Sequence, residues 1–349
     1  MKGLSKLLNL AVGMGLGGLF LWYIFHDLDY GRLLKALEHA NYGYLPLYAS
    51  TVLGYHLIRI FRWHLMLQPL HPYKFRRTFQ IGSVGFLSIF LLPFRLGELV
   101  RPYLAAQEPK VKFSSVLATI MVERTIDGIV LTLLFFVLAM LAPNIDDPNI
   151  PLDLAMFGKG ALLVFAVSLA GIVTLMVLGE RGMRLAELIG GLFSRRFGTR
   201  LARLVGNFLE GIRVVHGYKK AGAFLLLTLA YWTTNGLGGW ILFHALHETS
   251  HLPLVAGYGL MAVLGVAVMV PNLPGFVGAF QVAVYLALLM YDGSIDKESA
   301  IALSFIMQGT VLAVQAGCGL PFVLTGRVSL LKTVKSSEDA QAMLDADVT

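Results

Sequence analysis

LLPFRLGELVRPYL, the stretch from Leu91 to Leu104, ends an apolar run that begins at Phe79. A proline, Pro93, is followed here by three charged residues at helical spacing, which are Arg95, Glu98 and Arg101. Proline removes a backbone donor and glycine relaxes φ, so we predict an interrupted helix. A charge at membrane depth costs roughly 2.5–3.5 kcal/mol on insertion scales and persists where it faces a protein interior or a wet cavity. Broken, charged helices are typical of substrate sites in secondary transporters.

Composition indicates a polytopic membrane protein. Of the 349 residues, 56% are hydrophobic and 14% are charged, and the mean hydropathy is +0.71, whereas soluble domains are about 25% charged. This length accommodates about eight membrane passages and leaves little for a soluble catalytic domain. We expect the formal charge of +7 to reflect basic loops on the cytoplasmic side and not nucleic-acid binding. The single cysteine, Cys318, has no partner for an internal disulfide.

Loop charge predicts an all-α fold with about six full spans and two re-entrant helical hairpins. The predicted full spans are Leu7–Phe25, Tyr44–Met66, Ser114–Leu141, Phe157–Leu178, Phe224–Phe243 and Ala300–Thr325. The segments Thr78–Ala105 and Leu254–Tyr291 each have loops of one charge character on both sides, so neither is expected to cross once. This topology places both chain termini in the cytoplasm and the protein in the plasma (inner) membrane.

The same pattern predicts one integral membrane domain over residues 1–335 and a disordered polar tail over 336–349. Two halves of opposite orientation, about 1–141 and 157–326, each contain one hairpin, as in many transporters. The predicted tips match as Pro93-x-x-x-Gly97 and Pro271-x-x-x-Gly275. The basic segment 179–222 is predicted to be amphipathic and to lie on the cytoplasmic leaflet, with a solvated basic loop as the alternative.

Charged side chains gather at three places along the predicted spans. They are His56, Arg59 and Arg62, then Arg95, Glu98 and Arg101, then Glu123, Arg124 and Asp127. The planar guanidinium of arginine donates two parallel hydrogen bonds and therefore suits phosphate. The alternative is that the carboxylates only neutralise the arginines and so permit membrane insertion. Both interpretations remain open at this point.

Three sequence blocks resemble the lysylphosphatidylglycerol synthase transmembrane, or flippase-like, family. They are Pro93-Phe-Arg95-Leu-Gly97-Glu98-Leu-Val-Arg101, Glu123-Arg124-Thr-Ile-Asp127 and Pro271-Asn272-Leu-Pro-Gly275-Phe-Val-Gly278-Ala-Phe-Gln281. The resemblance implies an integral membrane protein that translocates or handles lipids. Lipid-modifying members carry a cytoplasmic aminoacyl-transferase domain, which the residues after Thr325 are too few to form, so we expect translocation and not lysyl transfer. Gln281 stands where the family commonly has an acidic residue, and glutamine cannot relay a proton.

We therefore predict a lipid translocase, not an enzyme, that moves an anionic phospholipid or a polyprenyl-phosphate-linked lipid between leaflets. The predicted substrate-binding residues are Arg59, Arg62, Arg95, Glu98, Arg101, Glu123, Arg124, Asp127, Pro271, Asn272, Gly275 and Gln281. No cofactor is predicted, and the sequence contains no G-x-x-x-x-G-K-[ST] loop for ATP. An alternative is a non-catalytic membrane subunit that recruits a lipid-modifying enzyme through residues 179–222. Self-association is left open.

One motif favours a different chemistry. The residues from His247 to His251 read H-E-T-S-H, the H-E-x-x-H spelling of zinc proteases, and Asp292 is a candidate third ligand. Zinc binding needs both histidines on one helical face, whereas Pro253 indicates that the helix ends nearby. A surface-loop role is the favoured interpretation, and an intramembrane zinc enzyme using Glu248 is the alternative.

Overall fold

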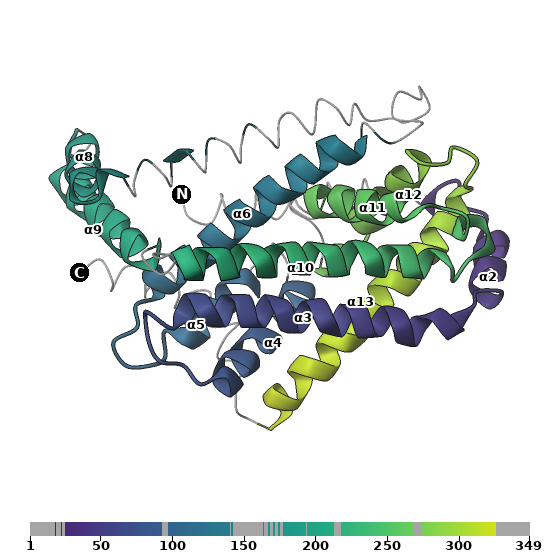
Figure 1. Ribbon diagram of the computed structural model, residues 1–349, viewed down its shortest axis with the longest axis horizontal. Helices are drawn as coiled ribbons and strands as arrows, with labels where there is room; N and C mark the ends of the chain where they lie inside the picture. The colour runs from purple at the N-terminus through teal and green to yellow at the C-terminus, as the bar shows by residue number, and fades with distance from the viewer. Residues whose placement is uncertain are drawn as a thin grey trace.

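The computed structural model describes residues 18, 22, 25–92, 97–139, 141, 163, 167, 170–171, 174, 177–192, 194–212, 218–267 and 274–325. Within these ranges all regular secondary structure is helical (Figure 1). Most of the predicted spans 7–25 and 157–178 lies outside the described residues. The same holds for Arg95, Pro271, Asn272 and the tail 336–349.

Four long helices form at predicted spans. They are α3 (Leu45–Leu67), α6 (Phe113–Ala139), α10 (Tyr218–Phe243) and α13 (Lys297–Leu324). Because α10 begins at Tyr218, Lys219 and Lys220 lie on the helix and not in the preceding loop. Within the described ranges, α13 alone is both long and apolar enough to cross a membrane, judged by length and composition. The crossing of a membrane by the other helices stays a prediction.

The first predicted hairpin is a pair of antiparallel helices, α4 (Phe75–Leu91) and α5 (Val100–Ala105). Its two ends lie together, because the Tyr73 hydroxyl donates to the carbonyl of Ala105 at 2.6 Å. Nearer the tip, Gly97 packs so closely on α4 that a Cβ there would overlap the backbone nitrogen of Ile89. The segment therefore turns back on itself as predicted, while its re-entry into a membrane stays a prediction.

The second predicted hairpin consists of α11 (Leu254–Ala267), the 3-10 helix η5 (Pro274–Phe276) and α12 (Ala279–Leu289). Gly275 adopts φ of 73°, in the left-handed region that glycine tolerates. The side chain of Gln281 accepts from the backbone N–H of Gly278 at 2.7 Å and thereby caps α12. This tip meets the first one, since the rings of Phe90 and Phe276 pack edge to face with centroids 5.6 Å apart.

The two hairpins enter from opposite ends of the long axis, along which α3 and α10 run side by side (Figure 1). At one end, α2 (Tyr30–Glu38) and the 3-10 helix η1 (Tyr42–Tyr44) pack beside α13 and the end of α10. There the backbone N–H of Asp29 donates to Glu298 at 3.0 Å. The main apolar core lies between α3, α6 and α10–α13. The opposite orientation of the two halves in a membrane stays a prediction.

At the other end of the molecule, α8 (Glu180–Gly191) and α9 (Arg195–Ile212) form a helical pair that extends from the body (Figure 1). Both helices are amphipathic. The apolar side chains of Leu188 and Leu192 are 70% and 84% exposed. The structure thus places an uncovered apolar face in the basic segment 179–222, and its location on a cytoplasmic leaflet stays a prediction.

Candidate functional site

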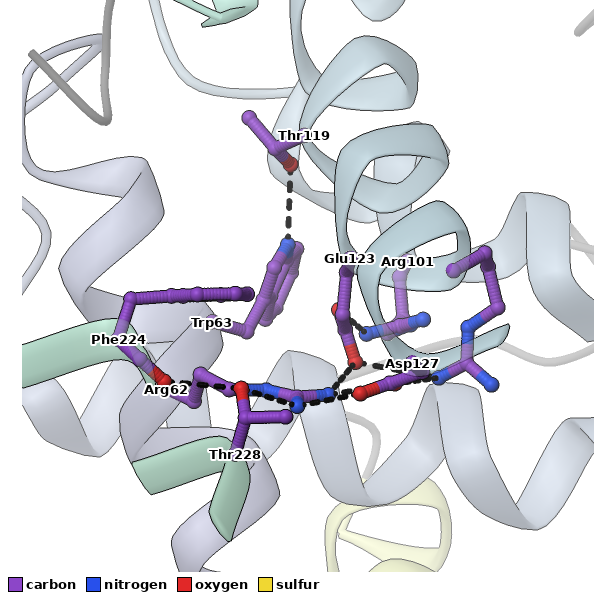
Figure 2. A network of polar contacts seen from close by, with 9 residues as sticks. Arg62, Trp63, Arg101, Thr119, Glu123, Asp127, Phe224 and Thr228 are labelled. Atoms are coloured by element: carbon purple, nitrogen blue, oxygen red, sulfur yellow. Dashed lines mark hydrogen bonds and ion pairs between the residues drawn. The ribbon is translucent and has the colours of Figure 1, made fainter. Parts of the chain in front are cut away.

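A buried network of ion pairs joins the long helices at the level of the first hairpin (Figure 2). Arg62 of α3 forms a bidentate ion pair with Asp127 of α6, in which both terminal nitrogens donate, at 2.6 Å and 2.7 Å. It also donates to Glu123 at 3.0 Å and to the Thr228 hydroxyl of α10 at 3.0 Å. The side chains of Arg62 and Glu123 are 0% exposed. This geometry fixes α3, α6 and α10 relative to one another.

The first hairpin joins the same network through Arg101 of α5. Its Nη1 donates to Glu123 at 3.2 Å, and its guanidinium lies 4.4 Å from the ring centre of Phe86. A Cβ at Gly85 would overlap the Arg101 side chain, so glycine makes room for this arginine to lie along α4. Arg124 Nη2 donates to Glu123 at 3.1 Å. Glu123 therefore accepts from three arginines.

Mutual pairing accounts for these residues in the way that the neutralisation alternative predicted. Arg62, Arg101 and Arg124 carry three positive charges, and Glu123 and Asp127 carry two negative ones. Buried charges need such partners because burial removes their hydration. The charge of Glu98 also acts on Arg101 and Arg124, so three described carboxylates balance these three arginines.

Arg59 lies one turn before Arg62 on α3 and is bound differently. Among the described residues it forms no ion pair; its Nη2 lies 3.4 Å from His56 Nδ1, and its guanidinium carbon lies 3.2 Å from the ring centre of Phe86. Its Nε has no hydrogen-bond partner there. Arg59 is therefore a half-buried cation that pairs with no carboxylate of the described residues.

Arg59 lines a cavity of about 510 Å³ between the two hairpin tips. The charged residues on its wall are Arg59, Glu98, Arg124 and Asp127. The tip aromatics Phe90 and Phe276 lie on the wall as well, together with apolar side chains of α6, α11 and α13. The cavity thus has a part lined by two arginines and two carboxylates and a part lined by apolar side chains.

The family of the chain follows from comparison with known proteins. A family model described as Lysylphosphatidylglycerol synthase TM region matches residues 7–319. The chain belongs to this family. The match confirms the resemblance seen in the sequence blocks, and it indicates an integral membrane protein with a lipid-related function.

One relative of this family member is named Glycosyltransferase AglD, from Haloferax volcanii. It is 23% identical over 364 residues, which cover 97% of this chain and 58% of the relative. The chain therefore spans little more than half the length of that protein. No solved structure matches this chain.

The predicted site residues of this lysylphosphatidylglycerol synthase family member separate into three groups. Arg59, Glu98, Arg124 and Asp127 meet at the cavity. Arg62, Arg101 and Glu123 lie in the buried network behind its wall. The other described ones, Gly275 and Gln281, brace the second tip: Gln281 donates to Gln308 at 2.8 Å, and Gln308 donates to the Gly275 carbonyl. Substrate binding by any of them stays a prediction.

Sequence reasoning missed the polar and aromatic side chains that complete the cavity. They are Tyr48, Tyr55, Tyr231, Trp232, Asn235 and Gln315. Their helices read as ordinary apolar spans, so the aromatic residues carried no special signal. Asn235 and Gln315 did carry one, because an uncharged polar residue inside an apolar span is itself costly and typically functional.

The H-E-x-x-H spelling does not lie on an α-helix. His247 and Glu248 begin the short 3-10 helix η4 (His247–Thr249), and the α-helical spacing that joins two histidines to one metal is missing. His251 instead lies 2.8 Å from Asp292, whose pKa is lowered by hydrogen bonds from Ser294 and by His251. Within the described residues there is no group of three or more His, Cys, Asp or Glu placed to hold a metal.

Proposed function

We propose that this protein moves a lipid with an anionic head group between membrane leaflets and holds that head group at Arg59, in the cavity between the hairpin tips. One observation carries the proposal. Glu123 and Asp127 pair with Arg62, Arg101 and Arg124, whereas Arg59 faces the cavity without a carboxylate among the described residues.

Charge supports an anionic ligand. The described cluster contains four arginines, at 59, 62, 101 and 124, and three carboxylates, at 98, 123 and 127, so one positive charge is in excess. A cation shielded from water favours an anion nearby, and the fork of a guanidinium matches two phosphate oxygens. A phosphate in the cavity would balance this excess charge.

The hairpins suggest how a head group would pass. They come from opposite ends of the molecule and touch at Phe90 and Phe276 (Figure 1). Interrupted helices that meet at mid-depth let a transporter open its site to one side and then the other. We infer that separation of one tip at a time exposes the cavity to one leaflet, while the lipid tails stay in the bilayer.

Leaflet exchange in vesicles tests the proposal. Purified protein is reconstituted with fluorescent phosphatidylglycerol, and Arg59→Gln is compared with wild type. A charge-assisted hydrogen bond contributes about 1.5–3 kcal/mol, so exchange is expected to fall at least about tenfold. Arg59→Lys should retain part of the rate because the charge remains.

The matched control is Arg32→Gln, which removes the same charge from an arginine that is 73% exposed on α2. It should exchange lipid at the wild-type rate. If Arg59→Gln protein at normal levels also matches wild type, the head group does not bind at Arg59 and the proposal is wrong.

A second candidate is a non-catalytic subunit that recruits a lipid-modifying enzyme, and the uncovered apolar face of α8 at Leu188 and Leu192 favours it. In that case reconstituted protein alone would exchange no lipid. Charged substitutions at these two leucines would then abolish function in cells, and Arg59→Gln would not.

A further inference from the structure

We propose that the head group which this cavity accepts is a phosphate that carries a sugar, with the phosphate at Arg59 and the sugar ring beside Trp232, Asn235 and Gln315. This inference rests on the proposed function and names its substrate class. It comes from the uncharged polar residues that line the cavity.

Two polar atoms of these uncharged residues lack a hydrogen-bond partner among the described residues. Gln315 is 2% exposed, and its Oε1 accepts no hydrogen bond from the described residues. The indole Nε1 of Trp232 is buried and has no acceptor among them. Both residues line the cavity. Since buried polar atoms are normally hydrogen-bonded, a ligand becomes the partner of both once their side chains turn toward the cavity.

The types of these two atoms select the ligand. The Gln315 oxygen requires a donor and the Trp232 N–H requires an acceptor. An ionised phosphate accepts only, and an ammonium group donates only and is repelled by Arg59 and Arg124. A hydroxyl both donates and accepts. A hydroxyl group is therefore the neutral group that can bond to both the Gln315 oxygen and the Trp232 N–H.

The surrounding side chains suit a ring with several hydroxyls. Tyr231 packs edge to face on Tyr55 and on Trp232, with ring centres 5.8 Å and 4.8 Å apart. Asn235 donates its Nδ2 to the Tyr231 carbonyl at 2.8 Å, which leaves its Oδ1 as a further acceptor. Rigid aromatic faces with polar groups at their edges pack against the C–H face of a sugar and bind its hydroxyls. The cavity, at about 510 Å³, is far larger than a bare phosphate needs.

The test compares ligands that differ only in the sugar. Full-length protein in nanodiscs is titrated with a polyprenyl phosphate hexose, with the same polyprenyl phosphate lacking the hexose, and with water-soluble hexose 1-phosphate. We expect the glycosylated lipid to bind about tenfold more tightly than the bare one, the gain from one or two net hydrogen bonds. Hexose 1-phosphate should compete weakly because it lacks the tail.

Two near-isosteric variants locate the effect. Trp232→Phe removes the indole N–H and keeps an aromatic ring, and Gln315→Met removes the amide. Each should lower the affinity for the glycosylated lipid more than the affinity for the bare phosphate and so reduce the preference between them. Trp240→Phe, on the same helix outside the cavity wall, should change neither. If Gln315→Met fails to fold, Trp232→Phe alone decides.

Three contrary results are distinguishable. Equal binding of the glycosylated and bare lipids by wild type would overturn the sugar assignment and leave the proposed function standing. Arg59→Gln without effect on either lipid would overturn the proposed function itself. Hexose 1-phosphate that binds as tightly as its lipid would overturn the assignment to a lipid.

Discussion

Glu123→Gln probes the buried network most sharply. The substitution keeps the side-chain size and removes the charge that accepts from Arg62, Arg124 and Arg101, at 3.0, 3.1 and 3.2 Å. Glu123 is 0% exposed, so water cannot replace it. The new amide also turns one donor toward an arginine. With Glu98 included, the net charge of the network rises from zero to one positive charge.

The expected cost follows from that burial. Breaking a buried ion pair by removing one partner costs about 3–5 kcal/mol because the remaining charge is left uncompensated. The matched control is Glu108→Gln, which breaks the pair with Arg77 at 3.2 Å, where both side chains are about 30% exposed. A pair this exposed is worth about 0–1 kcal/mol.

The assay is thermal unfolding of purified protein in detergent, followed by tryptophan fluorescence. Glu123→Gln should lower the midpoint by several degrees, and Glu108→Gln should barely change it. Adding Arg101→Met to Glu123→Gln removes the extra positive charge and should recover part of the loss. If Glu123→Gln unfolds at the same temperature as Glu108→Gln, the network does not stabilise the helices and this reasoning is wrong.

Three further outcomes are expected. Gly97→Ala should lower the yield of folded protein, because its Cβ would overlap the backbone of α4, whereas Gly309→Ala meets nothing within 4 Å and should not. Ser294→Ala should raise the pKa of Asp292, which Ser294 holds below its ordinary value. A carboxyl of lowered pKa stabilises the fold above its unfolded pKa and loses that effect as pH falls, so acid unfolding should begin at a higher pH. Gln281→Leu removes the side-chain hydrogen bonds to Gly278 and Gln308 at the second hairpin tip. It should slow lipid exchange clearly and lower the unfolding temperature only slightly.

Local sequence signals located the helices and their breaks. The expected span Tyr44–Met66 is α3 (Leu45–Leu67), because its apolar run is continuous and the residues around Gln68 and Pro69 end it. Pro93 and Gly97 located the first break, since proline and glycine act on their own backbone. Equal charge on both flanks of Thr78–Ala105 required the chain to return, and Tyr73 does meet Ala105.

Partner choice in the site could not be read from spacing. Arg59 and Arg62 lie less than one helical turn apart on α3, yet Arg62 pairs with Asp127 whereas Arg59 lines the cavity. That difference depends on the angle at which α3 packs on α6 and α10, which the sequence of α3 does not encode. For the same reason Trp232 and Gln315 come together only in the folded chain.

The most direct measurement asks whether an anionic head group occupies the cavity. With Cys318, the single cysteine, replaced by alanine, Val311→Cys places a thiol on the cavity wall and Arg32→Cys places one on the exposed surface of α2. A water-soluble thiol reagent should label Val311→Cys more slowly in phosphatidylglycerol than in phosphatidylcholine, and Arg32→Cys equally in both. Equal labelling of Val311→Cys in the two lipids would contradict head-group binding in this cavity.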